Sequence, residues 1–161
     1  MDALGALVAA ERAAGRTIVL TNGCFDLLHV GHVRLLQACR QYGDVLIVGV
    51  NSDASARALK GPDRPFVPEA ERAELLAALA GVDYVVVFEE RTAERLAEVV
   101  RPDVYVKGAD YACASDGAGA IDEGRLPEAS VVRRYGGRVV LAPLVPDRST
   151  TGLVERIRRA R

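Results

Sequence analysis

The sequence predicts an α/β fold with a doubly wound, parallel, five-stranded sheet, and three observations favour it. Short apolar runs alternate with helical patterns of about 10–15 residues, which is the spacing of β-α-β units. The run Val45–Val50 is continuously apolar, as expected for a strand buried on both faces. Most polar segments without periodicity directly follow a predicted strand. Because ligands of such sheets bind at the carboxyl ends of the strands, we expect one shared site there.

Composition places the chain among ordinary globular proteins. Its 161 residues suffice for one domain, 1–161, half of the residues are hydrophobic, and the net charge is −1. This charge argues against nucleic-acid binding, which needs a basic excess, and no apolar run is long enough to span a membrane. Three cysteines (Cys24, Cys39 and Cys113) form no CxxC pair, and the N-terminus lacks the charged region of a signal peptide. We therefore expect a cytoplasmic protein that has no membrane or nucleic-acid partner, no disulfides and no zinc site.

The first half of the chain predicts helices and strands in alternation. In order, they are a helix at 3–14, a strand at 17–21, a helix from 33 to about 42, a strand at 45–50, a short helix at 54–59 and, after a proline-rich loop at 60–68, a helix at 69–80. The last of these places Leu75, Leu76 and Leu79 on one face. Residues 51–53 offer capping side chains for the short helix.

The second half continues the alternation. In order, we expect a strand at 84–88, a helix capped by Thr92 and running through Val100, a strand at 103–106, a non-periodic excursion at 112–125, a helix near 127–135, a strand at 138–142 and a last helix capped by residues 149–151. Leu153, Val154 and Ile157 should face inward from the last helix. We interpret the arginines that close it (Arg156, Arg158, Arg159 and Arg161) as a solvated final turn that complements the helix dipole.

Residues 21–32, Thr-Asn-Gly-Cys-Phe-Asp-Leu-Leu-His-Val-Gly-His, hold the only two histidines of the chain. The segment joins a predicted strand to a helix N-terminus, where unpaired N–H groups and the helix dipole attract anions. It is neither a P-loop nor a dinucleotide fingerprint. Gly31 leaves room for a phosphate to approach the backbone, and His29 and His32 can donate to it from both sides. The alternative is that both histidines act only as helix caps.

The stretch Asn22–His32 resembles the signature of the HxGH nucleotidyltransferases of the cytidylyltransferase-like superfamily, whose fold is Rossmann-like. Within that superfamily, the chain is most similar to the adenylyltransferase domain of bacterial ADP-heptose synthases. The similarity covers about residues 17–157. Its other matching segments are Val48–Asp53, Leu59–Gly61 with Arg64 and Pro65, Glu71 and Arg72 with Leu79 and Val82–Asp83, Phe88–Glu90, Arg101–Asp103, Val106–Tyr111 and Ser149–Thr151.

The resemblance implies transfer of AMP from ATP to a sugar 1-phosphate, here D-glycero-β-D-manno-heptose 1-phosphate, with release of pyrophosphate and with Mg²⁺ accompanying ATP. Such a displacement at phosphorus needs positioning and charge stabilisation more than covalent catalysis. The catalytic candidates are His29 and His32, which would donate to the phosphates, and Lys60, which would supply a point charge from a flexible loop. A solvated loop lysine is the alternative for Lys60.

The resemblance also implies two sets of binding residues. ATP would contact Asn22, Gly23, Cys24, Phe25, Asp26, Gly31, Lys107, Gly108, Asp110, Ser149, Thr150 and Thr151, and the acceptor would contact Asn51, Asp53, Arg64 and Arg72. Several residues keep a second interpretation. Cys24 suits a small packed residue better than a catalytic thiol, Ser149 suits a helix cap, and Arg72 suits a surface ion pair with Glu69 or Glu71. Asp26 can orient His29 or the turn, and Asp110 can contact ribose or metal.

Other functions and partners remain open at this point. One alternative is a cytidylyltransferase that acts on glycerol 3-phosphate or a similar phospho-alcohol, and another is a nucleotide-binding module without catalysis. Many relatives carry a fused sugar kinase, so we expect a separate sugar kinase and a phosphatase in the same pathway. A homodimer is also open. Residues 112–125 are longer and richer in glycine and alanine than expected for the family, so we expect them to influence the choice of sugar.

Overall fold

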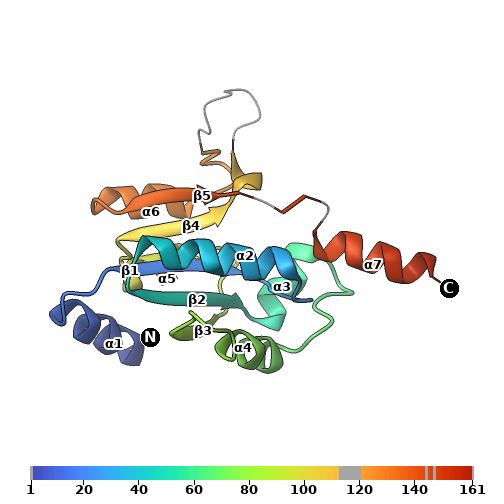
Figure 1. The fold of residues 1–161 in the computed structure, drawn as a ribbon, viewed down its shortest axis with the longest axis horizontal. Helices are drawn as coiled ribbons and strands as arrows, with labels where there is room; N and C mark the ends of the chain where they lie inside the picture. Colours follow the sequence, from blue (N-terminus) through green and yellow to red (C-terminus); the bar gives the residue numbers. More distant parts are fainter. Residues whose placement is uncertain (1, 113–120, 144, 147, 161) are drawn as a thin grey trace.

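Five parallel strands form one sheet in the order β3-β2-β1-β4-β5, with helices on both faces (Figure 1). The computed structural model describes residues 2–112, 121–143, 145–146 and 148–160. The strands are β1 (Ile18–Gly23), β2 (Val45–Asn51), β3 (Tyr84–Phe88), β4 (Val104–Gly108) and β5 (Arg138–Ala142). The α-helices are α1 (Asp2–Ala13), α2 (Val30–Cys39), α3 (Asp53–Lys60), α4 (Glu69–Ala77), α5 (Glu94–Val100), α6 (Glu128–Arg134) and α7 (Thr150–Arg159). The predicted fold class is confirmed.

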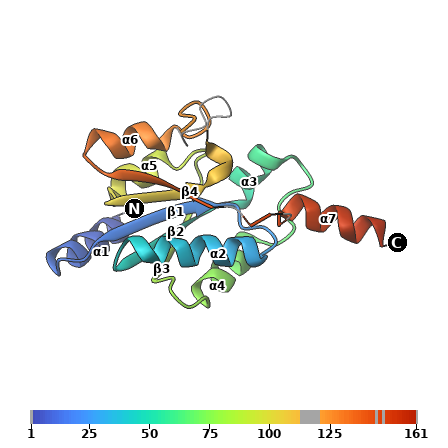
Figure 2. The ribbon, with the colours of Figure 1, turned by 45° about the horizontal axis from the view of Figure 1, so that its top comes forward.

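The strands separate two apolar cores because successive side chains point to opposite faces. On β1, Ile18 and Leu20 pack with residues of α1, α5 and α6, whereas Val19 packs with residues of α2 and α4. Figure 2 shows α2 and α4 on one side of the sheet and α5 and α6 on the other. The three β1 side chains are fully buried, and each stabilises the fold by about 1.5–3 kcal/mol. Burial on both faces explains why β1 and β2 read as continuous apolar runs.

The chain order reverses at β1, and this reversal positions the site. From β1 the chain builds outward through β2 to β3, and it then returns to add β4 and β5 on the other side. β1 pairs with β2 through six residues but with β4 only through Val19–Val104 and Leu20–Tyr105. The carboxyl ends of β1 and β4 therefore separate at the switch point, where doubly wound sheets bind ligands.

Several predicted boundaries differ from the structure. Asn22 and Gly23 belong to β1 rather than to a turn, and Lys107 belongs to β4. The prediction that Thr92 caps α5 was wrong. The N-cap is Ala93, whose N–H donates to the Glu128 carboxylate at 2.6 Å, while the Thr92 hydroxyl contacts Glu94. A carboxylate 35 residues away takes the capping role, which no local pattern reveals.

Two predicted apolar faces also differ. No described residue of α7 is fully buried. The predicted inward face was wrong for Ile157, which is 59% exposed, whereas Leu153 and Val154 are half-buried. Helix α7 extends away from the sheet (Figure 1), and it therefore has no core to face. On α4, Leu76 is buried together with Arg72, whereas Leu75 is 50% exposed. Most of the predicted excursion 112–125 lies outside the described residues. No helix in the described ranges is long and apolar enough to cross a membrane.

Candidate functional site

The two histidines lie together at the N-terminus of α2. His29 is the N-cap, and its Nδ1 accepts a hydrogen bond from the Gly31 N–H at 3.1 Å. A Cβ at Gly31 would lie 2.8 Å from the His29 ring, so this position excludes a side chain because the imidazole folds back over it. The capping alternative thus holds for His29. Because Nδ1 accepts, Nε2 carries the proton of the neutral ring and remains its donor.

His32 is not a cap. Its ring stacks on His29 with centroids 3.9 Å apart and meets the edge of Phe25 at 5.2 Å. Its Nδ1 is buried and has no hydrogen-bond partner among the described residues. Burial, followed by the nearby charge of His29, lowers the pKa of His32 to about 4. The pKa of His29 is lowered by burial and by the charge of Arg148. Both rings are therefore neutral near pH 7 and suited to donate hydrogen bonds.

Phe25 makes the turn between β1 and the histidines. Its φ is +49°, a left-handed conformation that is costly for a bulky residue and concentrates at functional sites. The ring is nonetheless buried, in contact with His32. A Cβ at Gly23 would lie 3.3 Å from this ring. Gly23 and Phe25 therefore shape the turn that places the histidine pair. Neither has a polar side-chain group that could bind a ligand.

Lys107 lies in the gap between β1 and β4. Its ammonium is buried and donates to the backbone oxygen of Asn22 at 3.0 Å and to the amide oxygen at 3.3 Å. It also lies 4.7 Å from the centroid of the Tyr111 ring. Burial lowers the pKa of Lys107, and Glu128 and Asp110 oppose that shift. Tyr105 donates to the same Asn22 amide oxygen. These contacts bring the predicted residues Asn22 and Lys107 together at the switch point.

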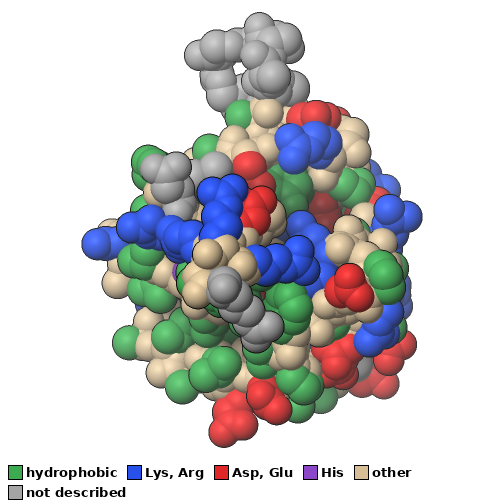
Figure 3. Space-filling view, turned by 90° about the vertical axis from the view of Figure 1, so that its right-hand side faces the viewer, with side chains coloured by type: hydrophobic (Ala, Val, Ile, Leu, Met, Phe, Trp, Pro, Cys, Tyr) green, Lys and Arg blue, Asp and Glu red, His purple; other side chains and the backbone are tan. Residues whose placement is uncertain are grey.

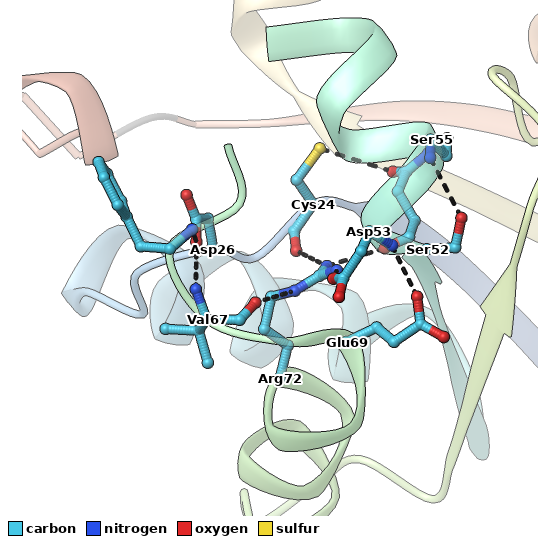
Figure 4. A network of polar contacts seen from close by, with 10 residues as sticks. Cys24, Asp26, Ser52, Asp53, Ser55, Val67, Glu69 and Arg72 are labelled. Atoms are coloured by element: carbon cyan, nitrogen blue, oxygen red, sulfur yellow. Dashed lines mark hydrogen bonds and ion pairs between the residues drawn. The ribbon is translucent and has the colours of Figure 1, made fainter. Parts of the chain in front are cut away.

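Arg72 is a buried hub beneath the site (Figure 4). Its guanidinium donates to three backbone oxygens and one carboxylate: Cys24 at the end of β1, Asn51 at the end of β2 (2.8 Å), Val67 in the loop before α4 (2.8 Å) and Asp53 at the start of α3 (2.7 Å). The side chain is 0% exposed, so the predicted surface ion pair with Glu69 or Glu71 was wrong. Glu69 instead accepts from the Asp53 N–H at 2.6 Å.

Asp26 holds the loop between α3 and α4 against the motif. Its carboxylate accepts from the N–H groups of Phe66 (2.6 Å) and Val67 (3.0 Å) and pairs with Arg64 at 2.5 Å. The guanidinium of Arg64 also lies over the Phe66 ring, 4.3 Å from its centroid. The observed partners of Asp26 are therefore in this loop, and they do not include His29. Arg64 is partly exposed beside the site, and the Asp26 carboxylate balances its charge.

The outer side of the site is a pocket of about 250 Å³ between this loop and α7. Three predicted site residues line it: Lys60, Arg64 and Thr151. Lys60 is the last residue of α3 rather than part of the loop, which corrects the prediction, and it is exposed. The Ser149 hydroxyl caps α7 by accepting from the Gly152 N–H at 3.0 Å, as its second interpretation expected. Thr150 and Thr151 form the first turn of α7, where N–H groups attract anions.

The remaining candidates lie between these two sides. The Asn51 amide is buried and donates to the Ser55 hydroxyl at 2.9 Å. Burial raises the pKa of the Cys24 thiol, which fits a packed residue better than a nucleophilic thiolate. Gly108 is buried at the end of β4, and Asp110 is exposed in the short turn that follows. No described group of three or more His, Cys, Asp or Glu side chains could hold a metal ion.

Sequence reasoning missed the residues that hold the site together over long distances in the chain. Tyr105 reaches Asn22 across 83 positions, and Glu128 reaches the start of α5 across 35. Tyr105 lies in a predicted strand, but a buried hydroxyl leaves no trace in an apolar pattern. The one local signal was the charge of Glu128 at the start of a predicted helix, and it indicates a helix end rather than a distant partner.

Comparisons with known proteins agree with this geometry. The family model described as cytidylyltransferase-like matches residues 20–152. Two bacterial proteins named bifunctional protein HldE are each 52% identical: that of Geotalea uraniireducens covers 98% of this chain, and that of Geobacter metallireducens covers 99%. The chain spans only 30–31% of their length.

A solved structure gives a further comparison. The lipopolysaccharide core biosynthesis protein from Thermoplasma volcanium is 27% identical, with a TM-score of 0.61, and the match covers 81% of this chain and 98% of that one. The family match spans the predicted histidine motif and the strands at the switch point. It confirms the predicted class of enzyme, a nucleotidyltransferase. The chain belongs to the cytidylyltransferase-like family.

Proposed function

We propose that this chain transfers AMP from ATP to D-glycero-β-D-manno-heptose 1-phosphate, giving ADP-heptose and pyrophosphate. One observation carries the proposal: a stacked, neutral histidine pair at the N-terminus of α2, beside the opening between β1 and β4. The choice of nucleotide and sugar is supported by the resemblance to ADP-heptose synthases and by the HldE relatives.

The chemistry needs an oriented acceptor and stabilised charge. An oxygen of the sugar phosphate attacks the α-phosphorus of ATP in line, the bond to the β-phosphate oxygen breaks, and pyrophosphate leaves with the electron pair. His29 and His32 would donate hydrogen bonds to the phosphate oxygens as charge develops on them. Lys60 and the first turn of α7, with Thr150 and Thr151, would hold other phosphates. Mg²⁺ would enter with ATP and neutralise part of the phosphate charge.

The inner residues take supporting roles in this proposal. Lys107 with Gly108 and Asp110 would lie beside the nucleoside, where β4 separates from β1. Arg64 would face the acceptor phosphate, with Asp26 fixing its loop. Arg72 and Asn51, whose polar groups are already bonded inside the protein, would act by positioning the strand ends rather than by touching the acceptor.

A pyrophosphate-release assay tests the proposal. The purified protein is incubated with MgATP and the heptose 1-phosphate, and the product is identified by ³¹P NMR. We expect ADP-heptose and pyrophosphate in equal amounts. Turnover with CTP and glycerol 3-phosphate, but not with ATP and sugar 1-phosphates, would establish the cytidylyltransferase alternative. ATP binding without pyrophosphate release from any sugar 1-phosphate tested would leave a nucleotide-binding module without catalysis.

A further inference from the structure

One arginine of the C-terminal helix differs from its neighbours in where it lies. Arg158 lines the 250 Å³ pocket between α7 and the loop before α4, whereas Arg156 and Arg159 do not. The α7 residues that line this pocket are Thr151, Val154, Glu155 and Arg158, with the i, i+3, i+4, i+7 spacing of one helix face. The helix therefore places Arg158 at the pocket, whereas Arg156 and Arg159 lie outside it.

Basic side chains slightly outnumber acidic ones along the pocket. Lys60, Arg64 and Arg158 line it together with two carboxylates, Asp63 and Glu155. Arg64 is already paired with Asp26. Among the ion pairs formed between described residues, neither Lys60 nor Arg158 takes part. Two cations thus line one pocket, and neither has a counter-ion in contact among the residues that the structure describes. Figure 3 shows basic side chains gathered on the end of the molecule that carries α7.

The size of the pocket limits what part of a ligand it can hold. Pockets for whole drug-sized ligands run from about 300 to 1,000 Å³, so about 250 Å³ suits one part of a nucleotide or sugar phosphate. The guanidinium fork, the Lys60 ammonium and the first turn of α7 with its Thr151 hydroxyl all favour phosphate oxygens.

We propose that Arg158 binds a phosphate group of a substrate in the pocket between α7 and residues 60–66, which Lys60 and Thr151 also line. The proposal rests on the proposed function for the identity of the substrates. The phosphate belongs either to the triphosphate of ATP or to the sugar 1-phosphate. Separate KM measurements for the two substrates distinguish these sources. In both cases α7 contributes a phosphate-binding side chain from its third turn in addition to the N–H groups of its first turn.

The test is Arg158→Gln, with Arg156→Gln and Arg159→Gln as matched controls on the same helix. KM is measured for MgATP at saturating sugar 1-phosphate and then for the sugar 1-phosphate at saturating MgATP. Loss of an exposed charge-assisted contact predicts a rise of about tenfold in one of the two KM values, with kcat changed much less. The phosphate that Arg158 binds belongs to the substrate whose KM rises. Arg158→Lys should recover part of the loss because it keeps the charge.

Two kinetic outcomes would overturn the proposal. Both KM values for Arg158→Gln could stay within about twofold of wild type, or Arg159→Gln could raise the same KM equally, which would indicate only the general field of the helix. A failure of the proposed function looks different, since wild type would then release no pyrophosphate. Calorimetric titration with MgATP and with the heptose 1-phosphate decides the role of Arg158 in that case. Weaker binding by Arg158→Gln than by Arg159→Gln supports it, whereas equal or undetectable binding in wild type and variant overturns it.

Discussion

The two sides of the candidate site are built in opposite ways. On the inner side, Arg72, Asp26 and Lys107 are buried and have their polar groups bonded to strand ends and to the loop before α4. On the outer side, Lys60 and Arg158 are exposed, and α7 buries none of its described residues. Apart from the Arg72–Val67 contact, the inner contacts join segments that are 19–85 positions apart, whereas the outer pocket lies between one loop and one peripheral helix.

This difference separates stability from binding. Buried polar groups must find hydrogen-bond partners inside the protein. Losing such a partner lowers the stability of the fold by more than the intact hydrogen bond adds to it. Arg72, Asp26 and Lys107 are therefore bonded to the protein before any substrate arrives, and they fix the positions of the strand ends. Exposed cations lose little by remaining unpaired in water. The outer side can thus keep its cations available for phosphates.

The largest effect is expected for Arg72→Ala. The substitution removes four hydrogen bonds and leaves Asp53 and three backbone oxygens without their donor, so stability should fall by about 3–5 kcal/mol. Urea unfolding followed by circular dichroism measures it. Arg95→Ala is the matched control, because Arg95 pairs with Glu98 at 3.8 Å on the surface and should change stability by less than about 1 kcal/mol. Equal losses would contradict the claim that the buried Arg72 contacts stabilise the fold more than a surface ion pair does.

The next effect concerns turnover rather than stability. His32→Ala should lower kcat on the order of a hundredfold or more, the scale of a lost donor to the transition state, while the dissociation constant of ATP changes much less. Steady-state kinetics and calorimetry measure the two quantities. Losses of equal size in rate and in ATP affinity would make His32 a binding residue instead.

Acid pH should destabilise the fold through His32. Its pKa is lowered from 6.5 to about 4, so the folded state keeps the ring neutral and unfolding takes up a proton between these values. The stability contribution is complete above pH 6.5 and is lost as pH falls toward 4, by about 2 kcal/mol at pH 5. Urea unfolding at pH 7.5 and pH 5 should show a smaller acid loss for His32→Asn than for wild type. The same loss in both proteins would place the titrating group elsewhere.

The smallest effect is expected at the outer helix. Ser149→Ala removes the hydroxyl that caps α7, which costs about 1 kcal/mol in the helix itself. Because α7 buries no described residue, the midpoint of global unfolding should move little, while helical content by circular dichroism falls slightly. A drop as large as that of Arg72→Ala would show that α7 is part of the cooperative core.

Sequence reasoning reached the parts of the site that local patterns encode. The histidine motif, the apolar runs of β1 and β2, and the placement of polar segments at strand ends were enough to predict the parallel sheet and one shared site at its edge. The contact between Asn22 and Lys107 at that edge came from the structure. Sequence reasoning named Arg72 as a candidate for acceptor binding but missed its burial, because nothing in Glu69–Ala77 shows that an arginine rather than Leu75 faces the interior. It placed Lys60 in a loop, whereas Lys60 is the last residue of α3.

The sequence by itself determined the fold class and the histidine turn, since both depend on periodicity and on residues within one segment. Only the tertiary structure decided which charges are buried and which remain open. Asp26 has its partners 38–41 positions away, and Arg158 and Lys60 line one pocket between α7 and the loop before α4. The physical reason is that burial and pairing depend on what the rest of the chain places nearby, and that information is not contained in any short stretch of residues.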